Sequence, residues 1–171
     1  VNCMNEILIA NGFYHLWQTY LFEQGIDWQH IDFLKDERSQ LTHILSLPID
    51  TQSSYTLFFQ VIEKTKQALN CPHIVFEMAR YVRPEHFGVL GYMAARSNTV
   101  AEALQYIGRF SRLVIDGGEI TPMQVRRKDD VVYLCWPFLQ EKYCLISELT
   151  NALMVCLARQ IVPDYQFPLQ C

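Results

Sequence analysis

The spacing of apolar residues changes once along this chain, at Asp116-Gly117-Gly118. Before that point, apolar residues recur at three- and four-residue steps, which is the periodicity of helices that bury one face. After it, segments 119–127 and 131–137 are short runs suited to strands, and the polar link 128–130 is short enough for a hairpin. The pattern predicts an α+β fold that is mainly helical, with a small antiparallel hairpin in the C-terminal half.

Several segments repeat the helical pattern, and Gly, Pro and capping residues mark their ends. Thr99-Val100-Ala101-Glu102 has the S/T-x-x-E form of a capping box and should begin a helix that runs to about Ile115. Segment 86–97 is apolar almost all round, which predicts a central place in the core. The polar run Lys35 to Gln40 indicates a surface connection. The other predicted helices are 12–24, a short one over 27–34, 55–69, 72–81, and a last one from Glu141 or Ser147 to about Val162.

No internal repeat and no Ser/Gly-rich linker divides the chain, so residues 1–171 are expected to form one domain. Its hydrophobic content of 50% allows a core that is stable without a disulfide or a metal. The six cysteines form no C-x-x-C pair and the five histidines form no i,i+4 pair. We therefore interpret the cysteines as small buried residues and expect no metal site. Phosphate-loop and dinucleotide motifs are absent from the sequence, so no cofactor is predicted.

The charge and hydropathy of the chain limit the classes of partner that we expect it to bind. The net charge is −4, which does not favour binding to a phosphate backbone by this chain alone. The first residues lack the basic region of a secretory signal, and every apolar stretch is interrupted well short of the roughly 20 residues of a membrane-spanning helix. A cytoplasmic protein without membrane contact is expected.

Aromatic residues make up 13% of the chain. Rings of this kind line many small-molecule pockets, but most belong to ordinary cores, and the sequence leaves both interpretations open. It also leaves open a Cys-His pair formed through space, such as Cys71 or Cys135 with His86, which would make the chain a cysteine-dependent enzyme.

The segment from Pro84 to Phe110 resembles the "arabinose-binding type" sensor domain found at the amino terminus of many AraC/XylS transcription regulators. In that family P-x-x-x-G-x-L-G-Y precedes a few small residues, then S-x-T-x-x-E-A-L and an aromatic-rich helix. E-Q-G-I-D at 23–27 is similar to the end of the family's first helix. The matching positions of the central motif are Pro84, Gly88, Leu90, Gly91, Tyr92, Ser97, Thr99, Glu102, Ala103 and Leu104.

The resemblance implies the effector-sensing domain of a bacterial AraC-type regulator and not an enzyme. Family members continue with more sensor sequence and two helix-turn-helix units. This chain ends at Cys171 with neither, so we expect a truncated sensor whose parent protein meets DNA only through the missing C-terminal domain. Different members respond to amino acids, lipids and other molecules, so the resemblance does not imply arabinose.

We expect this domain to bind a small, largely apolar effector, to form a homodimer, or to do both. The pocket is predicted between the hairpin and the helix that starts at Phe87, with Tyr92, Tyr133 and Trp136 as apolar walls and Arg96 as an anchor for an anionic group. Two alternatives remain. A cysteine-dependent enzyme would have one fast-reacting thiol, and a purely structural dimerisation module would have no cavity.

Overall fold

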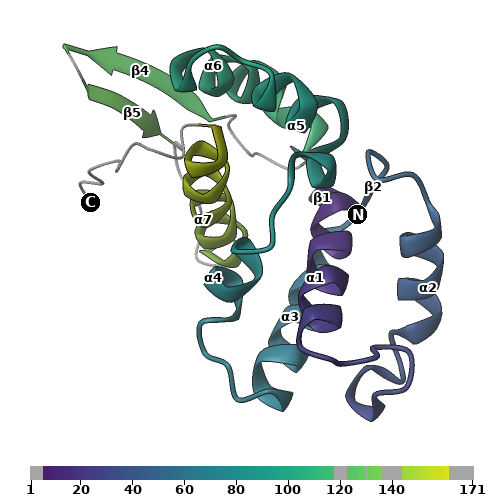
Figure 1. The fold of residues 1–171 in the computed structure, drawn as a ribbon. Helices are drawn as coiled ribbons and strands as arrows, with labels where there is room; N and C mark the ends of the chain where they lie inside the picture. The colour runs from purple at the N-terminus through teal and green to yellow at the C-terminus, as the bar shows by residue number, and fades with distance from the viewer. Residues whose placement is uncertain (1–5, 118–122, 130, 136–143, 162–171) are drawn as a thin grey trace.

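A three-stranded antiparallel sheet joins three distant parts of the chain. The computed structural model, drawn in Figure 1, describes residues 6–117, 123–129, 131–135 and 144–161. The strands are β1 (Leu8–Ala10), β2 (Gln52–Ser54) and β3 (Ile115–Asp116), in the order β2-β1-β3. Ile9 pairs with Ser53 on one side and with Ile115 on the other. This sheet was not predicted from the sequence. It ties residues 8–10 to residues 52–54 and 115–116.

The first layer consists of α1 (Gly12–Glu23), α2 (Arg38–Ser46) and α3 (Tyr55–Ala68). The helices predicted over 12–24 and 55–69 are thereby confirmed. The helix predicted over 27–34 is wrong, because only a 3-10 turn, η1 (Asp32–Leu34), forms there. The surface connection predicted from Lys35 to Gln40 is also wrong in part, because α2 begins inside it. Leu41 and Ile44 of α2 are buried, so the helix has a core face that the polar run conceals.

The main core lies between α1 and α3. Tyr14 packs edge-on against Phe58 with ring centroids 5.2 Å apart, and Phe13 contacts the same ring at 6.0 Å. Trp17 is fully buried, and its indole N–H donates to Thr65 Oγ1 at 3.1 Å. A buried indole needs such a partner, since an unpaired polar group in the core is costly.

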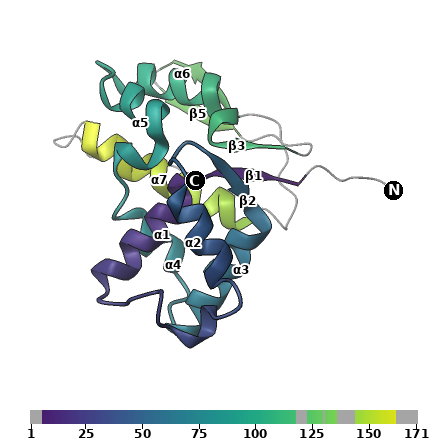
Figure 2. The same ribbon diagram turned by 90° about the vertical axis from the view of Figure 1, so that its right-hand side faces the viewer.

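The second half of the chain supplies a separate group of helices. These are α4 (Ile74–Ala79), the 3-10 turn η2 (Pro84–Phe87), α5 (Gly88–Ala95), α6 (Val100–Phe110), the turn η3 (Ser111–Leu113) and α7 (Cys144–Ile161). Helix α6 is shorter than predicted because the chain turns at η3 and enters β3. In Figures 1 and 2, α5 and α6 lie at one end of the molecule and α1 to α3 at the other, with α7 and the sheet between them.

The predicted central position of the helix at 86–97 is wrong. Leu90, Gly91 and Ala94 are buried, but Val89 and Tyr92 are 64% and 54% exposed. Helix α5 packs on η2 and α6, and Val89 and Tyr92 lie on its exposed side. An apolar surface all round a short helix therefore does not prove burial on every side.

The predicted hairpin is confirmed. It consists of β4 (Gln124–Lys128) and β5 (Val131–Cys135), which pair antiparallel with Arg126 opposite Tyr133. Most of its described residues are exposed, and β4 lies next to α6. The last helix begins at Cys144, between the two predicted starts, and buries Leu149 and Leu153. The whole is a mainly helical α+β fold, as predicted.

Candidate ligand pocket

An apolar cavity of about 210 Å³ lies between α5, α6 and α7. The described residues that line it are mostly small or aliphatic, and none of them is charged or aromatic. A smaller hollow of about 60 Å³ adjoins it and reaches toward Phe13 and Phe87. The two spaces share Gly91, Ala94, Ile107, Met154 and Leu157. The other residues that line the larger cavity are Pro84, Ala95, Val100, Ala103, Leu104, Ala158 and Gln160.

Two glycines of the motif give the α5 wall its position. Gly88 has φ +54° and ψ −135°, a conformation that residues with a Cβ rarely adopt. A Cβ on Gly91 would lie 1.8 Å from the carbonyl oxygen of Pro84, so only glycine lets α5 approach η2 this closely. The spacing P-x-x-x-G-x-x-G therefore folds the chain back on itself and places Gly91 and Ala94 at the cavity.

The α6 wall begins at the predicted capping box. Thr99 Oγ1 accepts a hydrogen bond from the backbone N–H of Glu102 at 3.1 Å. The Glu102 carboxylate accepts from the backbone N–H of Asn98 at 2.9 Å, one residue earlier than the standard capping box requires. The helix start is confirmed, and it turns Ala103 and Ile107 toward the cavity.

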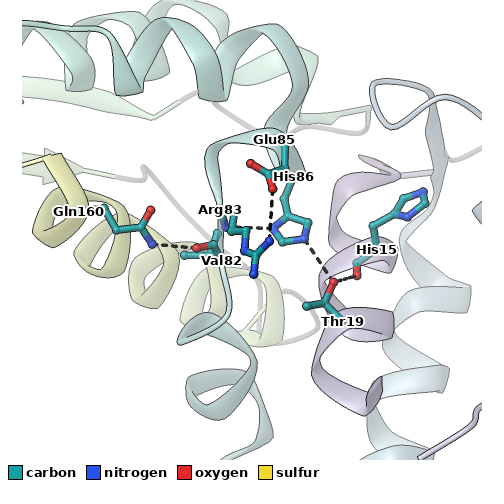
Figure 3. A network of polar contacts seen from close by, with 7 residues as sticks. All are labelled: His15, Thr19, Val82, Arg83, Glu85, His86 and Gln160. Atoms are coloured by element: carbon teal, nitrogen blue, oxygen red, sulfur yellow. Dashed lines mark hydrogen bonds and ion pairs between the residues drawn. The ribbon is translucent and has the colours of Figure 1, made fainter. Parts of the chain in front are cut away.

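A chain of polar contacts runs from the cavity edge to α1 (Figure 3). Gln160 on α7 donates through Nε2 to the Val82 carbonyl oxygen at 2.8 Å. Next along the chain, the Arg83 backbone N–H donates to His86 Nδ1 at 2.9 Å. His86 Nε2 faces Thr19 Oγ1 at 3.5 Å, and the Thr19 hydroxyl donates to the His15 carbonyl oxygen at 2.9 Å.

These contacts determine which ring nitrogen of neutral His86 carries the proton. Because Nδ1 accepts from a backbone N–H, the neutral ring carries its proton on Nε2 and donates toward Thr19. Burial lowers the pKa of His86, and the nearby charges of His15 and Arg83 lower it further, while Glu85 opposes them. The ring therefore holds η2 against α1 as a neutral group, and its role is to position the pocket wall.

The residues that we assigned to the pocket on the basis of the sequence lie in different places in the structure. Phe87 lines the smaller hollow and packs edge-on against Phe13, with ring centroids 5.5 Å apart. Tyr92, Arg96 and Tyr133 are exposed, and they line neither space. Trp136 lies outside the described residues.

Sequence reasoning missed the alanines and glycines that form the cavity. Ala94 and Ala103 are both almost completely buried and face the same space from two helices. The signal was present as a run of small residues on two consecutive predicted helices. Small residues in helices are also common in ordinary helix packing, so this run alone does not distinguish a cavity wall.

The cysteines differ from their predicted role. Of the four that the structure describes, Cys144 is exposed and Cys71, Cys135 and Cys156 are only partly buried. Cys144 begins a helix whose buried face starts one residue later, which explains its exposure. Burial raises the pKa of the Cys156 thiol, the opposite of what an activated nucleophile needs.

Within the described ranges, no group of three or more His, Cys, Asp or Glu side chains could hold a metal ion. None of the helices described there is long and apolar enough to cross a membrane.

Comparison with known proteins places the chain in a family. No curated protein matches it at a significant level. A family model, described as the N-terminal arabinose-binding domain of AraC transcription regulator, matches residues 38–170. That match covers most of the chain, including α5, α6 and α7, which enclose the cavity. The chain therefore belongs to the family of the N-terminal arabinose-binding domain of AraC transcription regulators.

Proposed function

We propose that this chain is the effector-sensing domain of a bacterial transcription regulator, and that a small, largely apolar molecule binds between α5, α6 and α7. The cavity between these helices is the observation that carries the proposal. Its volume of about 210 Å³ is below the roughly 300 to 1,000 Å³ of pockets for drug-sized ligands, so the effector is small. The family's printed name mentions arabinose, but a sugar needs many polar partners, and among the described lining residues Gln160 alone has a polar side chain.

The proposed action is binding without catalysis. A ligand changes a regulator only through its different affinity for two arrangements of the protein. Three helices meet at the cavity, and the chain of contacts through Val82 and His86 connects its edge to α1. Occupancy would favour one packing of these helices, and the DNA-binding part of the parent regulator would respond to that packing.

Self-association is a second candidate activity, supported by strand β5. Val131, Val132 and Tyr133 are 48%, 39% and 48% exposed, and consecutive exposed apolar residues on a strand favour contact with another protein surface. Light scattering at increasing protein concentration tests this by measuring the molar mass in solution. The mass should rise for the original chain and should rise less for Tyr133→Lys. A monomer at all concentrations would contradict it.

A thermal-shift screen tests effector binding. The screen should span fatty acids, aliphatic alcohols, aromatic acids, amino acids, sugars and nucleotides. A ligand at 100 times its Kd adds about 2.7 kcal/mol to the free energy of unfolding and should raise the Tm by several degrees. Ala103→Leu, which fills the cavity, should remove the shift. If only sugars or nucleotides raise the Tm, the apolar effector is wrong.

The regulatory part of the proposal needs the parent regulator. A promoter reporter under its control should respond to the molecule that raises the Tm of this domain. The Ala103→Leu substitution should abolish that response while the regulator stays at its normal level. A reporter that responds equally with and without the substitution would contradict the proposed coupling.

A further inference from the structure

We infer that the cavity takes an uncharged aliphatic molecule whose single polar group donates a hydrogen bond to Gln160 Oε1. This inference rests on the proposed function and narrows the effector to one chemical class. Medium-chain alcohols and primary amides belong to that class, whereas carboxylates, amines and planar aromatic molecules do not. Three properties of the lining support it.

The first property is that none of the described residues lining the cavity carries a charge. An ionised ligand group would lose its hydration there and find no opposite charge in return. Arg96, which the sequence offered as an anionic anchor, is exposed and outside the lining. The described part of the lining therefore favours a neutral molecule.

The second property is shape. The larger and smaller hollows lie side by side and share five lining residues, so a molecule that fills both must be elongated. An apolar cavity of about 150 Å³ accommodates benzene, so the larger hollow, at about 210 Å³, has room for about eight or nine non-hydrogen atoms. The walls of this hollow are aliphatic, and Met154 adds a flexible side chain. A saturated chain matches an elongated aliphatic space better than a rigid ring does.

The third property is the orientation of Gln160. Its Nε2 must face the Val82 carbonyl oxygen, 2.8 Å away, because only the NH₂ end of the amide can donate there. Figure 3 shows the side chain directed at Val82, with its oxygen on the other side of the amide. Gln160 is exposed, so Oε1 is the acceptor that this side chain can offer at the mouth of the cavity, and the matching ligand group is a hydroxyl or an N–H.

Titration calorimetry of the 171-residue chain with 1-alkanols tests chain length and charge. From butan-1-ol upward, Kd should fall about fourfold per added methylene, as expected for burial of each CH₂, and stop falling near octan-1-ol. Octanoate and octylammonium should bind at least about tenfold more weakly than octan-1-ol because of their charge. 2-Phenylethanol, which has as many non-hydrogen atoms as octan-1-ol, should also bind more weakly.

Variants locate the binding and test the hydrogen bond. Ala103→Leu should abolish octan-1-ol binding, whereas Ala101→Leu on the exposed side of the same helix should not. Ala158→Leu fills the cavity from α7 and serves the same purpose if the first variant does not fold. Gln160→Leu should weaken octan-1-ol about fivefold, the value of one ordinary hydrogen bond, and leave heptyl methyl ether unchanged.

The outcomes separate this inference from the proposed function. If octanoate or 2-phenylethanol binds more tightly than octan-1-ol, and Ala103→Leu removes that binding, the pocket stands and the ligand class is wrong. If Gln160→Leu affects the alcohol and the ether equally, the assigned hydrogen bond is wrong. If no probe and no member of the effector screen responds to either cavity-filling variant, both proposals are wrong.

Discussion

Two substitutions at His86 separate the two contacts of its ring. The amide oxygen of His86→Asn falls near the place of Nδ1 and can still accept from the Arg83 N–H. The longer side chain of His86→Gln reaches the place of Nε2 and leaves that N–H without its acceptor. The lost bond is 2.9 Å long and partly buried, so His86→Gln should cost about 1 to 3 kcal/mol at pH 8. His86→Asn gives up only the 3.5 Å contact with Thr19 and some packing, so it should cost less.

The pH dependence follows from the direction of the pKa shifts. Burial lowers the pKa of both His86 and His15 below the ordinary value of 6.5. Between the lowered pKa and 6.5, the unfolded chain binds more protons than the folded chain. The contribution of these two histidines to the free energy of unfolding is therefore fully present above about pH 6.5. It is lost as the pH falls, by at most about 1.4 kcal/mol per pH unit for each histidine. A proton on His86 Nδ1 would also face the Arg83 N–H, donor against donor.

Urea denaturation followed by circular dichroism between pH 8 and pH 5.5 measures both effects. His86→Asn should flatten the pH dependence and keep the part that comes from His15. His43→Asn, at an exposed histidine of α2, is the control and should leave the curve unchanged. The reasoning is refuted if His86→Asn is as pH-dependent as the original chain, or if His86→Gln is as stable as His86→Asn at pH 8.

Three further predictions concern packing, capping and DNA. Gly91→Ala would place its Cβ 1.8 Å from a backbone oxygen of η2 and should lower the free energy of unfolding by about 1 to 3 kcal/mol. Gly108→Ala meets only a side-chain methyl at 3.3 Å and should cost less in the same denaturation assay. Thr99→Ala should cost about 0.5 to 2 kcal/mol and be non-additive with Glu102→Ala, whereas unchanged midpoints would show that the helix start does not depend on either side chain. With its net charge of −4, the chain should show no sequence-specific DNA affinity at near-physiological salt, which an anisotropy titration can check.

Helices were predictable from the sequence because their signals are local. The core face of α3 repeats at three and four residues, and the start of α6 needs only Thr99 and Glu102. The strands β1 and β2 gave no such signal, since each has three residues and exists only through its pairing. In the sequence, the segment that forms β1 is only a short apolar patch. Its strand depends on the pairing of Ile9 with Ser53 and with Ile115, which lie far away in the sequence.

The pocket was predictable as a region but not as a set of residues. The helix at Phe87 does form part of the walls, as expected. None of the described residues of β4 and β5 lines either hollow, and Tyr133 is 48% exposed; Trp136 lies outside the described residues. A sequence reports which side chains are large and apolar, but a cavity forms where opposing side chains are too small to meet. Whether a cavity forms depends on which helices face each other. The periodicity of apolar residues within one helix does not predict that arrangement.

The family motif determines the frame of this cavity and not its ligand. Gly88 and Gly91 serve the backbone, one through a positive φ and one through the close approach to Pro84. Thr99 and Glu102 serve the start of α6. The contents of the cavity depend on residues such as Ala158 and Gln160, which lie on α7, outside the motif. In this chain the motif therefore positions the α5 and α6 walls, and we expect substitutions of Ala158 or Gln160 on α7 to change which molecule fits between them.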